Sequence, residues 1–245
     1  MTQRLACLLL VVALAATAGC SSTRKDERDP SDTARRLFDR SNELIESGNF
    51  VAGIGGLEGL TAIYPFSQEA RQAQLILMYA YWRNDQPDAA VTAADRFILE
   101  NPTHPRVDYA LYIKGLARFP SEPGILERLF RVDMDKRPPG EMQASFNTFA
   151  QLIQQHPRSM YVEDARQRMI YLRNRLAAHE LTVAQFYADR HAHVAAINRA
   201  RYIVENFQET PSMVPALRIM ARGYERLGLN ELAADTHQVI AANSP

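Results

Sequence analysis

The sequence has very few cysteines: only Cys7 and Cys20 among 245 residues. Cys7 lies in an apolar run, Leu5 to Ala16, which is too short to cross a bilayer as a stable helix. The small residues of Thr17-Ala18-Gly19-Cys20 close that run, a pattern typical of a cleaved secretory signal over residues 1–19. No cysteine follows position 20, which excludes a disulfide, a zinc–thiolate site or a thiol nucleophile in the folded part. We therefore expect a protein of an oxidising compartment that relies on packing alone.

An excess of one charge is also missing, with 28 Lys and Arg residues against 28 Asp and Glu residues. This balance gives no indication of nucleic acid or an anionic membrane face as a partner. A glycine-rich phosphate loop, a nucleophile elbow and an H-E-x-x-H motif are absent. Of the six dispersed histidines, His191 and His193 are two residues apart and so point to different helix faces, and we interpret His193 as a packing residue. The sequence predicts no enzyme, no metal site and no cofactor.

Strand-like alternation is missing as well, and from Thr33 onward apolar residues recur at helical spacings of three and four. Within this helical pattern one register recurs five times. It ends at Pro65, Pro102, Pro157, Gln208 and Pro245. Twelve residues earlier stands a small residue: Gly53, Ala90, Ser145, Ala196 or Ala233. Seventeen residues before each end is a turn position: Gly48, Asp85, Gly140, His191 or Gly228.

A turn residue, a small packing residue and a helix-ending proline at fixed offsets are typical of the tetratricopeptide helix–turn–helix repeat of about 34 residues. The predicted fold class is all-α, an α-solenoid of about five such repeats, an architecture that usually binds other polypeptides. The predicted segments are a signal peptide (1–19), a lipidated flexible tether (20–32), repeats 1 and 2 (33–102), repeat 3 with an inserted loop (103–157), repeat 4 with a long helix (158–210) and repeat 5 (211–245).

Two of the repeats are irregular. In the third, helices of about 106–119 and 141–156 flank a proline-rich loop over 120–140, in which Ile125 to Phe130 could form a short helix. In the fourth, neither glycine nor proline occurs between Pro157 and Pro211, so 161–189 is predicted as one helix of roughly 40 Å. A break near His179 is the competing interpretation.

The concave surface of such a solenoid is lined by fixed positions of the first helix of each repeat, and these positions differ between the two ends of the chain. In the first two repeats they include Phe38, Asn42, Ile45, Leu75, Tyr79, Trp82 and Arg83. In the fifth they include Arg218, Arg222 and Arg226. Exposed aromatic surface with a polar rim indicates an interaction site, and Trp, Tyr and Arg dominate such sites. We hypothesise that the first groove binds an extended peptide with an apolar or aromatic end, and that the last repeats dock a folded polar surface. Alternatively, the N-terminal segment or a neighbouring repeat covers Tyr79 and Trp82.

The stretch ending at Cys20 resembles a bacterial lipobox, in which the cysteine becomes the acylated first residue, although Thr17 stands where leucine is commonest. This resemblance implies a covalent lipid on Cys20 and no other cofactor. Ser21, which is not an aspartate, implies sorting to the outer membrane. More than one acyl chain gives stable anchoring, so the expected location is the outer membrane, lipid-anchored and facing the periplasm.

The whole pattern resembles the BamD family, lipoproteins of the β-barrel assembly machinery. The stretches that carry the resemblance are Asn101-Pro102-Thr103-His104-Pro105, Asp108-Tyr109, Gly115-Leu116, Val132-Asp133, Arg137-Pro138, Leu172, Arg175-Leu176, Val183-Ala184 and Tyr187. The resemblance implies binding of the barrel-inserting subunit, BamA, through the C-terminal repeats, where Asn198-Arg199 matches the family's contact pair. It also implies recognition of the aromatic-ended signal of unfolded outer-membrane proteins in an N-terminal pocket, and association with accessory Bam lipoproteins.

Two other classes remain open at this point. One is another adaptor of the same architecture, such as a pilus-assembly lipoprotein, for which the Asn101–Pro105 stretch and the interrupted third repeat would be unnecessary. The other is a peptidoglycan-associated enzyme, which would require a nucleophile or carboxylate in a cleft. The sequence does not identify the accessory subunits, the path of substrate transfer or the role of the 120–140 loop.

Overall fold

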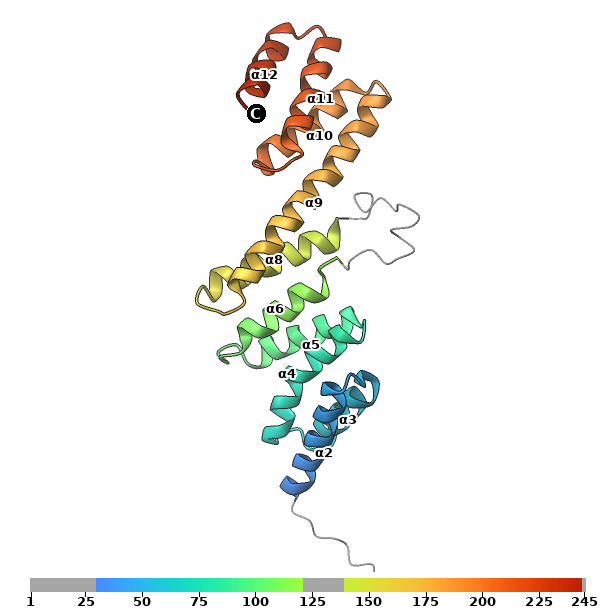
Figure 1. Cartoon of the computed structure of the whole chain (residues 1–245), viewed down its shortest axis with the longest axis vertical. Helices are drawn as coiled ribbons and strands as arrows, with labels where there is room; N and C mark the ends of the chain where they lie inside the picture. Colours follow the sequence, from blue (N-terminus) through green and yellow to red (C-terminus); the bar gives the residue numbers. More distant parts are fainter. Residues whose placement is uncertain (1–29, 121–138, 244–245) are drawn as a thin grey trace, which may run out of the picture.

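The computed structural model describes residues 30–120 and 139–243, and every regular element in these two stretches is an α-helix. The helices are α2 (Pro30–Glu46), α3 (Phe50–Ile63), α4 (Gln68–Arg83), α5 (Pro87–Glu100), α6 (Val107–Ala117), α8 (Gly140–Gln155), α9 (Val162–Asp189), α10 (His193–Asn206), α11 (Met213–Arg226) and α12 (Asn230–Asn243). They stack in antiparallel pairs along one long axis (Figure 1). The predicted all-α solenoid of tetratricopeptide type is confirmed.

The turns within the repeats explain why the register positions carry their residue types. Gly48, Asp85, His191 and Gly228 have φ values of +84°, +56°, +59° and +74°. Each follows the last turn of a helix, and the next amide donates to a carbonyl five residues back, as in Asn49 N to Leu44 O at 2.8 Å and Gln86 N to Tyr81 O at 2.9 Å. This is the Schellman helix end, which needs a left-handed residue and favours glycine. Asp85 and His191 adopt that conformation at some conformational cost.

The five small positions are where the two helices of each repeat approach closely. Gly53, Ala90, Ser145, Ala196 and Ala233 are all buried. The fully buried hydroxyl of Ser145 donates to the carbonyl of Gly115 at 2.8 Å, while the Phe149 ring fills the space that a side chain at Gly115 would need. Small residues at these contacts therefore set the spacing between the helices of each repeat.

Two hydrophobic clusters form the core. The smaller lies among α2, α3 and α4 and includes Leu57 and Leu60, both fully buried. The larger begins at Met78 and continues to Ala233, through α4 to α12. Tyr79 contacts both clusters. The solenoid is thus continuous, with Tyr79 at the junction of its first two repeats.

Helix α9 connects the two halves of the molecule. It is unbroken over 28 residues, about 42 Å, so the structure contradicts a break near His179. Figure 1 shows its lower end beside α8 and its upper end beside α10 and α11. At the lower end Tyr112 of α6 stacks on Tyr161 with centroids 4.5 Å apart, and its hydroxyl donates to Asp164 at 2.8 Å. These contacts fix α9 to the N-terminal half.

One predicted boundary was wrong. The tether was expected to extend through residue 32, but α2 begins at Pro30. The fixed φ of proline suits the first helical position, and Asp32 in the first turn interacts favourably with the helix dipole. The predicted signal peptide, Cys20 and the helix expected over 125–130 lie outside the described residues. Among the helices that are described, none has both the length and the apolar character required to span a bilayer.

Candidate functional site

A cavity of about 420 Å³ opens on the concave face of the N-terminal half. Residues from α2, the start of α3, α4 and the start of α6 surround it. They are Asn42, Ile45, Glu46, Gly48, Phe50, Leu75, Ile76, Tyr79, Arg83, Arg106 and Tyr109. The cavity therefore combines aliphatic and aromatic walls with two guanidinium groups and one carboxylate, that of Glu46, which accepts a hydrogen bond from Asn42 at 2.6 Å. We refer to it below as the N-terminal pocket.

Aromatic rings hold both guanidinium groups of this pocket. Arg83 lies 5.4 Å from the Phe50 ring centroid and 5.6 Å from that of Tyr79, and its Nη1 donates to the Tyr79 hydroxyl at 2.7 Å. Arg106 lies 4.9 Å from the Tyr109 centroid. Cation–π contacts and the hydrogen bond restrict these long side chains before any ligand binds. The pocket can therefore accept an anion with little further ordering of its own groups.

The hydroxyl of Tyr109 stays protonated at neutral pH. Burial and the neighbouring Tyr161 raise the pKa of Tyr109 to about 12, although Arg106 opposes the shift. A protonated phenol can donate a hydrogen bond, so it adds to the two guanidinium groups as a donor. The pocket thus presents donors and rings, and it suits a ligand that has both an anionic group and an aromatic surface.

The structure brings together five of the seven residues predicted for the N-terminal groove: Asn42, Ile45, Leu75, Tyr79 and Arg83. Ile45 lines the pocket with a side chain that is only 5% exposed. Its side chain fills the space left by Gly53, which has no Cβ. Ile45 thus forms the base of the pocket.

The other two predicted residues lie elsewhere. Trp82 is half-buried and lines a separate cavity of about 270 Å³, with Arg83 shared between the two. Phe38 is half-buried against the smaller hydrophobic cluster and lines neither cavity. Tyr79 contacts the Phe50 ring of the first repeat, with ring centroids 6.4 Å apart, and Trp82 lines its cavity together with Leu116 and Phe119 of the third.

Sequence reasoning missed Phe50, Ile76, Arg106 and Tyr109 as pocket residues. A signal for Tyr109 was present. Gln72, Leu75, Tyr79 and Trp82 are groove positions of the second repeat. Moving them by 37 residues, the spacing of Pro65 and Pro102, reaches Tyr109, Tyr112, Leu116 and Phe119 in the third. Phe50 lies at the beginning of α3, and Arg106 lies just before α6. The groove positions used for the prediction lie within the first helix of each repeat, so they could not identify these two residues.

A second concave cavity, of about 610 Å³, lies between α9 and α11 in the C-terminal half. Arg218 and Arg222 line it from α11, and Arg190 lines it from the end of α9. Arg218 and Arg222 are exposed and make no hydrogen bond or ion pair with the described residues. Arg190 lies 3.6 Å from the Phe186 ring centroid. We call this surface the C-terminal arginine groove.

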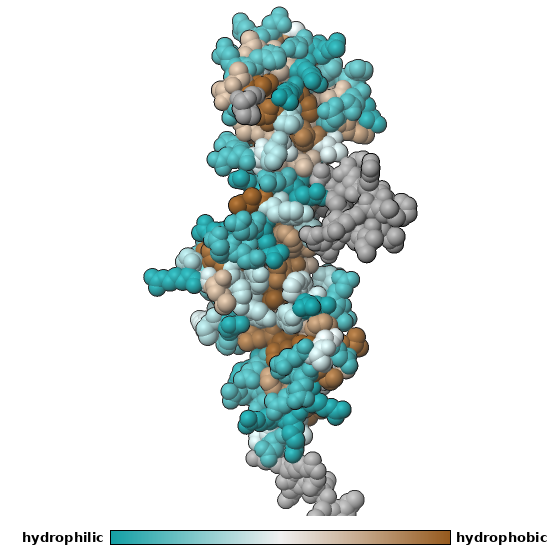
Figure 2. All heavy atoms as spheres, viewed as in Figure 1, coloured by the Kyte–Doolittle hydropathy of each residue, from teal (hydrophilic) through white to brown (hydrophobic). Residues whose placement is uncertain are grey.

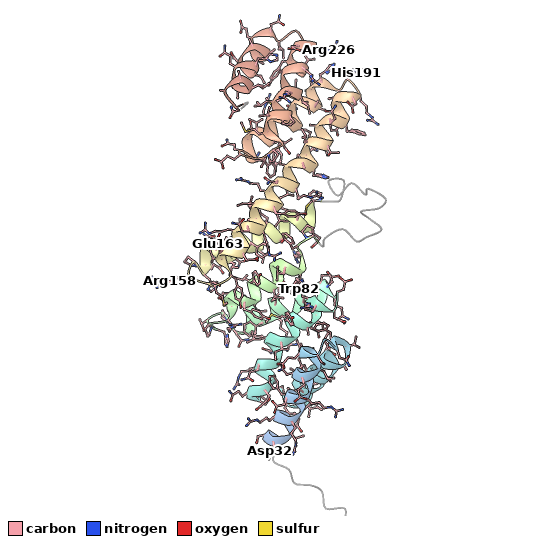
Figure 3. The ribbon with its side chains drawn as sticks, viewed as in Figure 1. Asp32, Trp82, Arg158, Glu163, His191 and Arg226 are labelled. Atoms are coloured by element: carbon pink, nitrogen blue, oxygen red, sulfur yellow. The ribbon has the colours of Figure 1, made fainter. Side chains whose placement is uncertain are left out.

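Two of the predicted C-terminal residues lie outside this groove. Arg199 is on α10 and pairs with Glu180 at 3.2 Å. At 100° per residue, Glu180 is on the opposite side of α9 from the residues that line the groove, such as Gln185 and Asp189. Arg226 is exposed in the last turn of α11. Figure 3 shows Arg226 near one end of the molecule, with Trp82 in the other half.

The titratable side chains form no group that could hold a metal ion within the described residues. His191 and His193 are neighbours, with ring centroids 6.0 Å apart, at the turn into α10. Neither carboxylates nor further histidines complete a ligand set around them. The two concave cavities have the composition of binding surfaces.

Fold and cavities together define an α-solenoid of tetratricopeptide type with two recessed surfaces that suit polypeptide ligands. A sequence model of the YfiO family, described as an outer membrane lipoprotein, matches residues 30–240, so the chain belongs to this family.

Relatives that match over nearly their full length support the same family assignment. The chain is 36% identical to the outer membrane protein assembly factor BamD of Neisseria meningitidis serogroup A, over 96% of this chain and 89% of that protein. It is 35% identical to BamD of Vibrio cholerae, over 95% and 96% of the two chains. BamD of Haemophilus influenzae is 31% identical, over 98% and 91%. Among solved structures, a crystal structure of MamA protein overlaps with a TM-score of 0.36 at 18% identity, over 85% of this chain and 90% of that one, which adds nothing to the argument.

Proposed function

We propose that this protein is an assembly factor for outer-membrane proteins, anchored to the outer membrane and facing the periplasm. It binds unfolded outer-membrane proteins in the N-terminal pocket and a BamA-like barrel-inserting subunit through its C-terminal repeats, beside accessory Bam lipoproteins. Family membership supports the proposal, since relatives matched over nearly their whole length are named as outer membrane protein assembly factors. The contribution is binding and positioning, with no bond made or broken.

The composition of the N-terminal pocket is the observation that carries this proposal. An aromatic-ended peptide has a ring and a carboxylate close together. The ring fits against Tyr79 and Tyr109, and the carboxylate fits between Arg83 and Arg106. Hydrogen bonds between guanidinium and carboxylate are about twice as strong as neutral ones. A pocket with rings and restrained cations therefore favours a free aromatic C-terminus over an internal segment.

The C-terminal arginines supply the second half of the proposed function. Arg218 and Arg222 are one helical turn apart, about 6 Å, on the same face of α11, and Arg226 continues that row. Alternate residues of an extended strand are about 6.7 Å apart. A row of exposed guanidinium groups at this spacing therefore suits carboxylates on the edge or face of a folded domain. Arg199, on the opposite side of α9, is proposed as a separate contact with the same partner.

Acylation of Cys20 is proposed to anchor the protein. The covalent lipid is the only non-protein group that the proposal requires. A Cys20→Ser substitution is expected to shift the protein from the membrane fraction to the soluble fraction of the periplasm, which cell fractionation measures. An unchanged distribution would mean that another interaction holds the protein at the membrane.

Depletion of the protein in its own host tests the proposed function. We expect the amounts of folded β-barrel proteins in the outer membrane to fall, as measured by heat-modifiable mobility on gels. Lipoproteins without a barrel serve as the internal control. Unchanged barrel levels after depletion would contradict the assembly function. A pilus-assembly function is less well supported, because the relatives that match nearly full length are named for outer-membrane protein assembly.

A further inference from the structure

Two grooves on the outer surface of the solenoid occupy equivalent places in different repeats. The first, of about 660 Å³, is enclosed by α3, α4 and α5. The second, of about 540 Å³, lies between α8 and the first half of α9, and we call it the α8–α9 groove. It has two walls, whereas the first groove has three.

The repeat register shows that the grooves are equivalent. Pro65 and Pro157 end the second helices of the first and third repeats and are 92 residues apart. Moving Glu58, Thr61 and Ala62 of the first groove by 92 residues gives Ala150, Ile153 and Gln154, which line the second. The same shift takes Gln74, Leu77 and Tyr81 to Arg166, Met169 and Arg173, which also line the second. The α8–α9 groove is therefore the same structural position without the helix that corresponds to α5.

The length of α9 explains the missing wall. Helix α5 has 14 residues and runs along the whole of the 16-residue α4. Helix α10 also has 14 residues, but α9 has 28. Two ion pairs show where α10 lies along α9. Arg199 of α10 pairs with Glu180, and Glu209, just beyond α10, pairs with Arg173. Helix α10 therefore ends level with about Arg173. Within the described residues, the first three turns of α9, about 18 Å, pack against α8 and α6 but have no helix in the place that α5 takes beside α4.

An apolar surface is left open at this place. Ile170 is 49% exposed and lines the groove together with Ile153 and Met169. In Figure 2 hydrophobic surface shows at the waist of the molecule, between the C-terminal helices and the part below them. In the first groove the equivalent apolar surface is covered by Ala89, Ala93 and Phe97 of α5. The uncovered stretch therefore has the width and the length of a short helix.

The charges indicate the chemistry of the missing helix. In the first groove Tyr81 donates to Glu58 at 2.5 Å, and Gln74 donates to Glu100 of α5 at 3.4 Å. In the α8–α9 groove the corresponding side chains are cations, Arg173 and Arg166, and Ala150 replaces the glutamate. One carboxylate, Glu163, also lines the groove and accepts a hydrogen bond from Gln167 at 3.4 Å. The buried Nε of Arg173 has no hydrogen-bond partner among the described residues. Arg173 already faces Glu209 at 4.0 Å, whereas Arg166 is exposed and has no ion-pair partner among the described residues. A carboxylate beside Arg166 would therefore be stabilising.

We propose that the α8–α9 groove binds a short amphipathic α-helix of a partner protein, in the place that α5 occupies in the second repeat. The bound helix presents small or apolar residues four positions apart, as Ala89, Ala93 and Phe97 do. It places a carboxylate beside Arg166, as Glu100 is placed beside Gln74. The inference is independent of the peptide site in the N-terminal pocket, which is on the concave face.

A labelled peptide tests the proposal with the full mature protein in detergent. The probe is a fluorescein-labelled 14-residue peptide with the sequence of α5, PDAAVTAADRFILE, held helical by a staple on its outer face. We expect micromolar binding by fluorescence anisotropy. Ile170→Glu is expected to weaken binding at least tenfold, because it places a charge in the apolar wall. Leu99→Glu, at a residue that is 82% exposed on α5, is the matched control and is expected to change binding less than twofold.

A charge exchange tests the polar part. Arg166→Glu is expected to weaken binding of this peptide about tenfold, and a peptide with lysine in place of its final glutamate is expected to recover most of the loss. Equal binding of an unstapled peptide with a central proline would show an extended occupant and would overturn the helix proposal. Binding that is unaffected by Ile170→Glu would overturn it as well, since the peptide would then bind elsewhere.

A cross-linking measurement in intact cells identifies the occupant. A photoreactive phenylalanine analogue replaces Gln167, which is exposed on the rim of the groove, and Gln238 on α12 serves as the control position. Adducts at position 167, mapped by mass spectrometry to an acidic amphipathic helix of another protein, would support the proposal. Adducts with lipid or with a second copy of this chain would overturn it.

Discussion

The two concave cavities are built from equivalent helices of the repeats, yet they present their arginines in different ways. In the N-terminal pocket, rings and a tyrosine hydroxyl hold Arg83, and Tyr109 lies beside Arg106. In the C-terminal arginine groove, Arg218 and Arg222 are exposed and make no such contacts. Arg83 and Arg106 are thus ordered in advance, whereas Arg218 and Arg222 keep their side-chain freedom, although Arg190 of the same groove lies on the Phe186 ring.

This difference matches two kinds of ligand. Ordered donors reduce the entropy cost of binding a short peptide, which contributes few contacts of its own. Mobile arginines adapt to a larger folded surface, which supplies many contacts and can order them on binding. Helix α9 connects the two halves of the molecule, and each half carries one of the two surfaces. Under the proposed function, the same scaffold binds a substrate at one end and a machinery subunit at the other.

The largest effect is expected from breaking α9 between the two surfaces. Ala178→Pro removes a helical hydrogen bond near the middle of this helix and should cost about 3 kcal/mol or more, whereas Ala178→Gly should cost about 1 kcal/mol. We expect the proline variant to unfold in two steps in urea, followed by circular dichroism, because the halves lose their connection. A single transition at the wild-type midpoint would show that α9 does not couple them.

Substitutions in the pocket should separate the functions of the two surfaces. Tyr79→Ala and Arg83→Gln are each expected to weaken binding of an aromatic-ended peptide roughly ten- to thirtyfold, as at other binding hot spots. Trp82→Ala should have a smaller effect, because Trp82 lines the adjacent cavity. Fluorescence anisotropy with a labelled peptide measures this, and Arg222→Gln is the control. If the affinity of Tyr79→Ala equalled that of the wild type, the pocket would not be the peptide site.

The next largest effect is expected from salt, which should weaken ligand binding differently at the two surfaces. Exposed arginines interact with a partner across water, so raising the salt concentration from about 50 to about 300 mM should weaken binding of the BamA-like subunit's periplasmic domains about tenfold. Peptide binding in the partly enclosed pocket should change less than about threefold. Biolayer interferometry at several salt concentrations gives both values. The reverse order would contradict the difference in side-chain ordering between the two sets of arginines.

The smallest effect concerns the contact between α6 and α9. Burial alone would raise the pKa of Asp164, but hydrogen bonds from Arg168 and Tyr112 hold it below its usual value of 3.8. This lowered pKa contributes stability that is present above pH 3.8 and is lost as the pH falls through the folded pKa. Asp164→Asn should therefore cost roughly 0.5–1 kcal/mol at neutral pH.

Urea denaturation at pH 7 and at low pH measures the Asp164 contribution. The difference between wild type and Asp164→Asn should shrink as the pH falls below 3.8, where the wild-type carboxylate becomes protonated. A difference of the same size at both pH values would mean that the substitution acts through packing and not through charge.

Much of the scaffold was predictable because local chemistry determines it. A left-handed turn requires Gly48 and Gly228 or a tolerated substitute, and close helix contacts require Ala90 and Ser145 to be small. The absence of glycine and proline correctly predicted an unbroken α9. These features depend on residues near one another in the sequence. One register therefore places the small residue in all five repeats and the left-handed turn in four of them.

The details of the sites were less predictable, because they depend on which helices meet. Ile45 became the base of the pocket because Gly53, on the next helix, leaves space for it. Trp82 and Tyr79 are three residues apart but line different cavities. Arg199 belongs to a helix that packs on the other side of α9 from Arg218. A fixed list of groove positions takes no account of these differences between repeats.

Simultaneous binding tests the central claim, that the two concave surfaces work separately on one rigid frame. The measurement is the affinity of the labelled aromatic-ended peptide for the full mature protein, with and without a saturating amount of the BamA-like subunit's periplasmic domains. We predict a ternary complex in which the peptide affinity changes less than about twofold. Displacement of the peptide by those domains would mean that both ligands use one surface, and it would contradict the account.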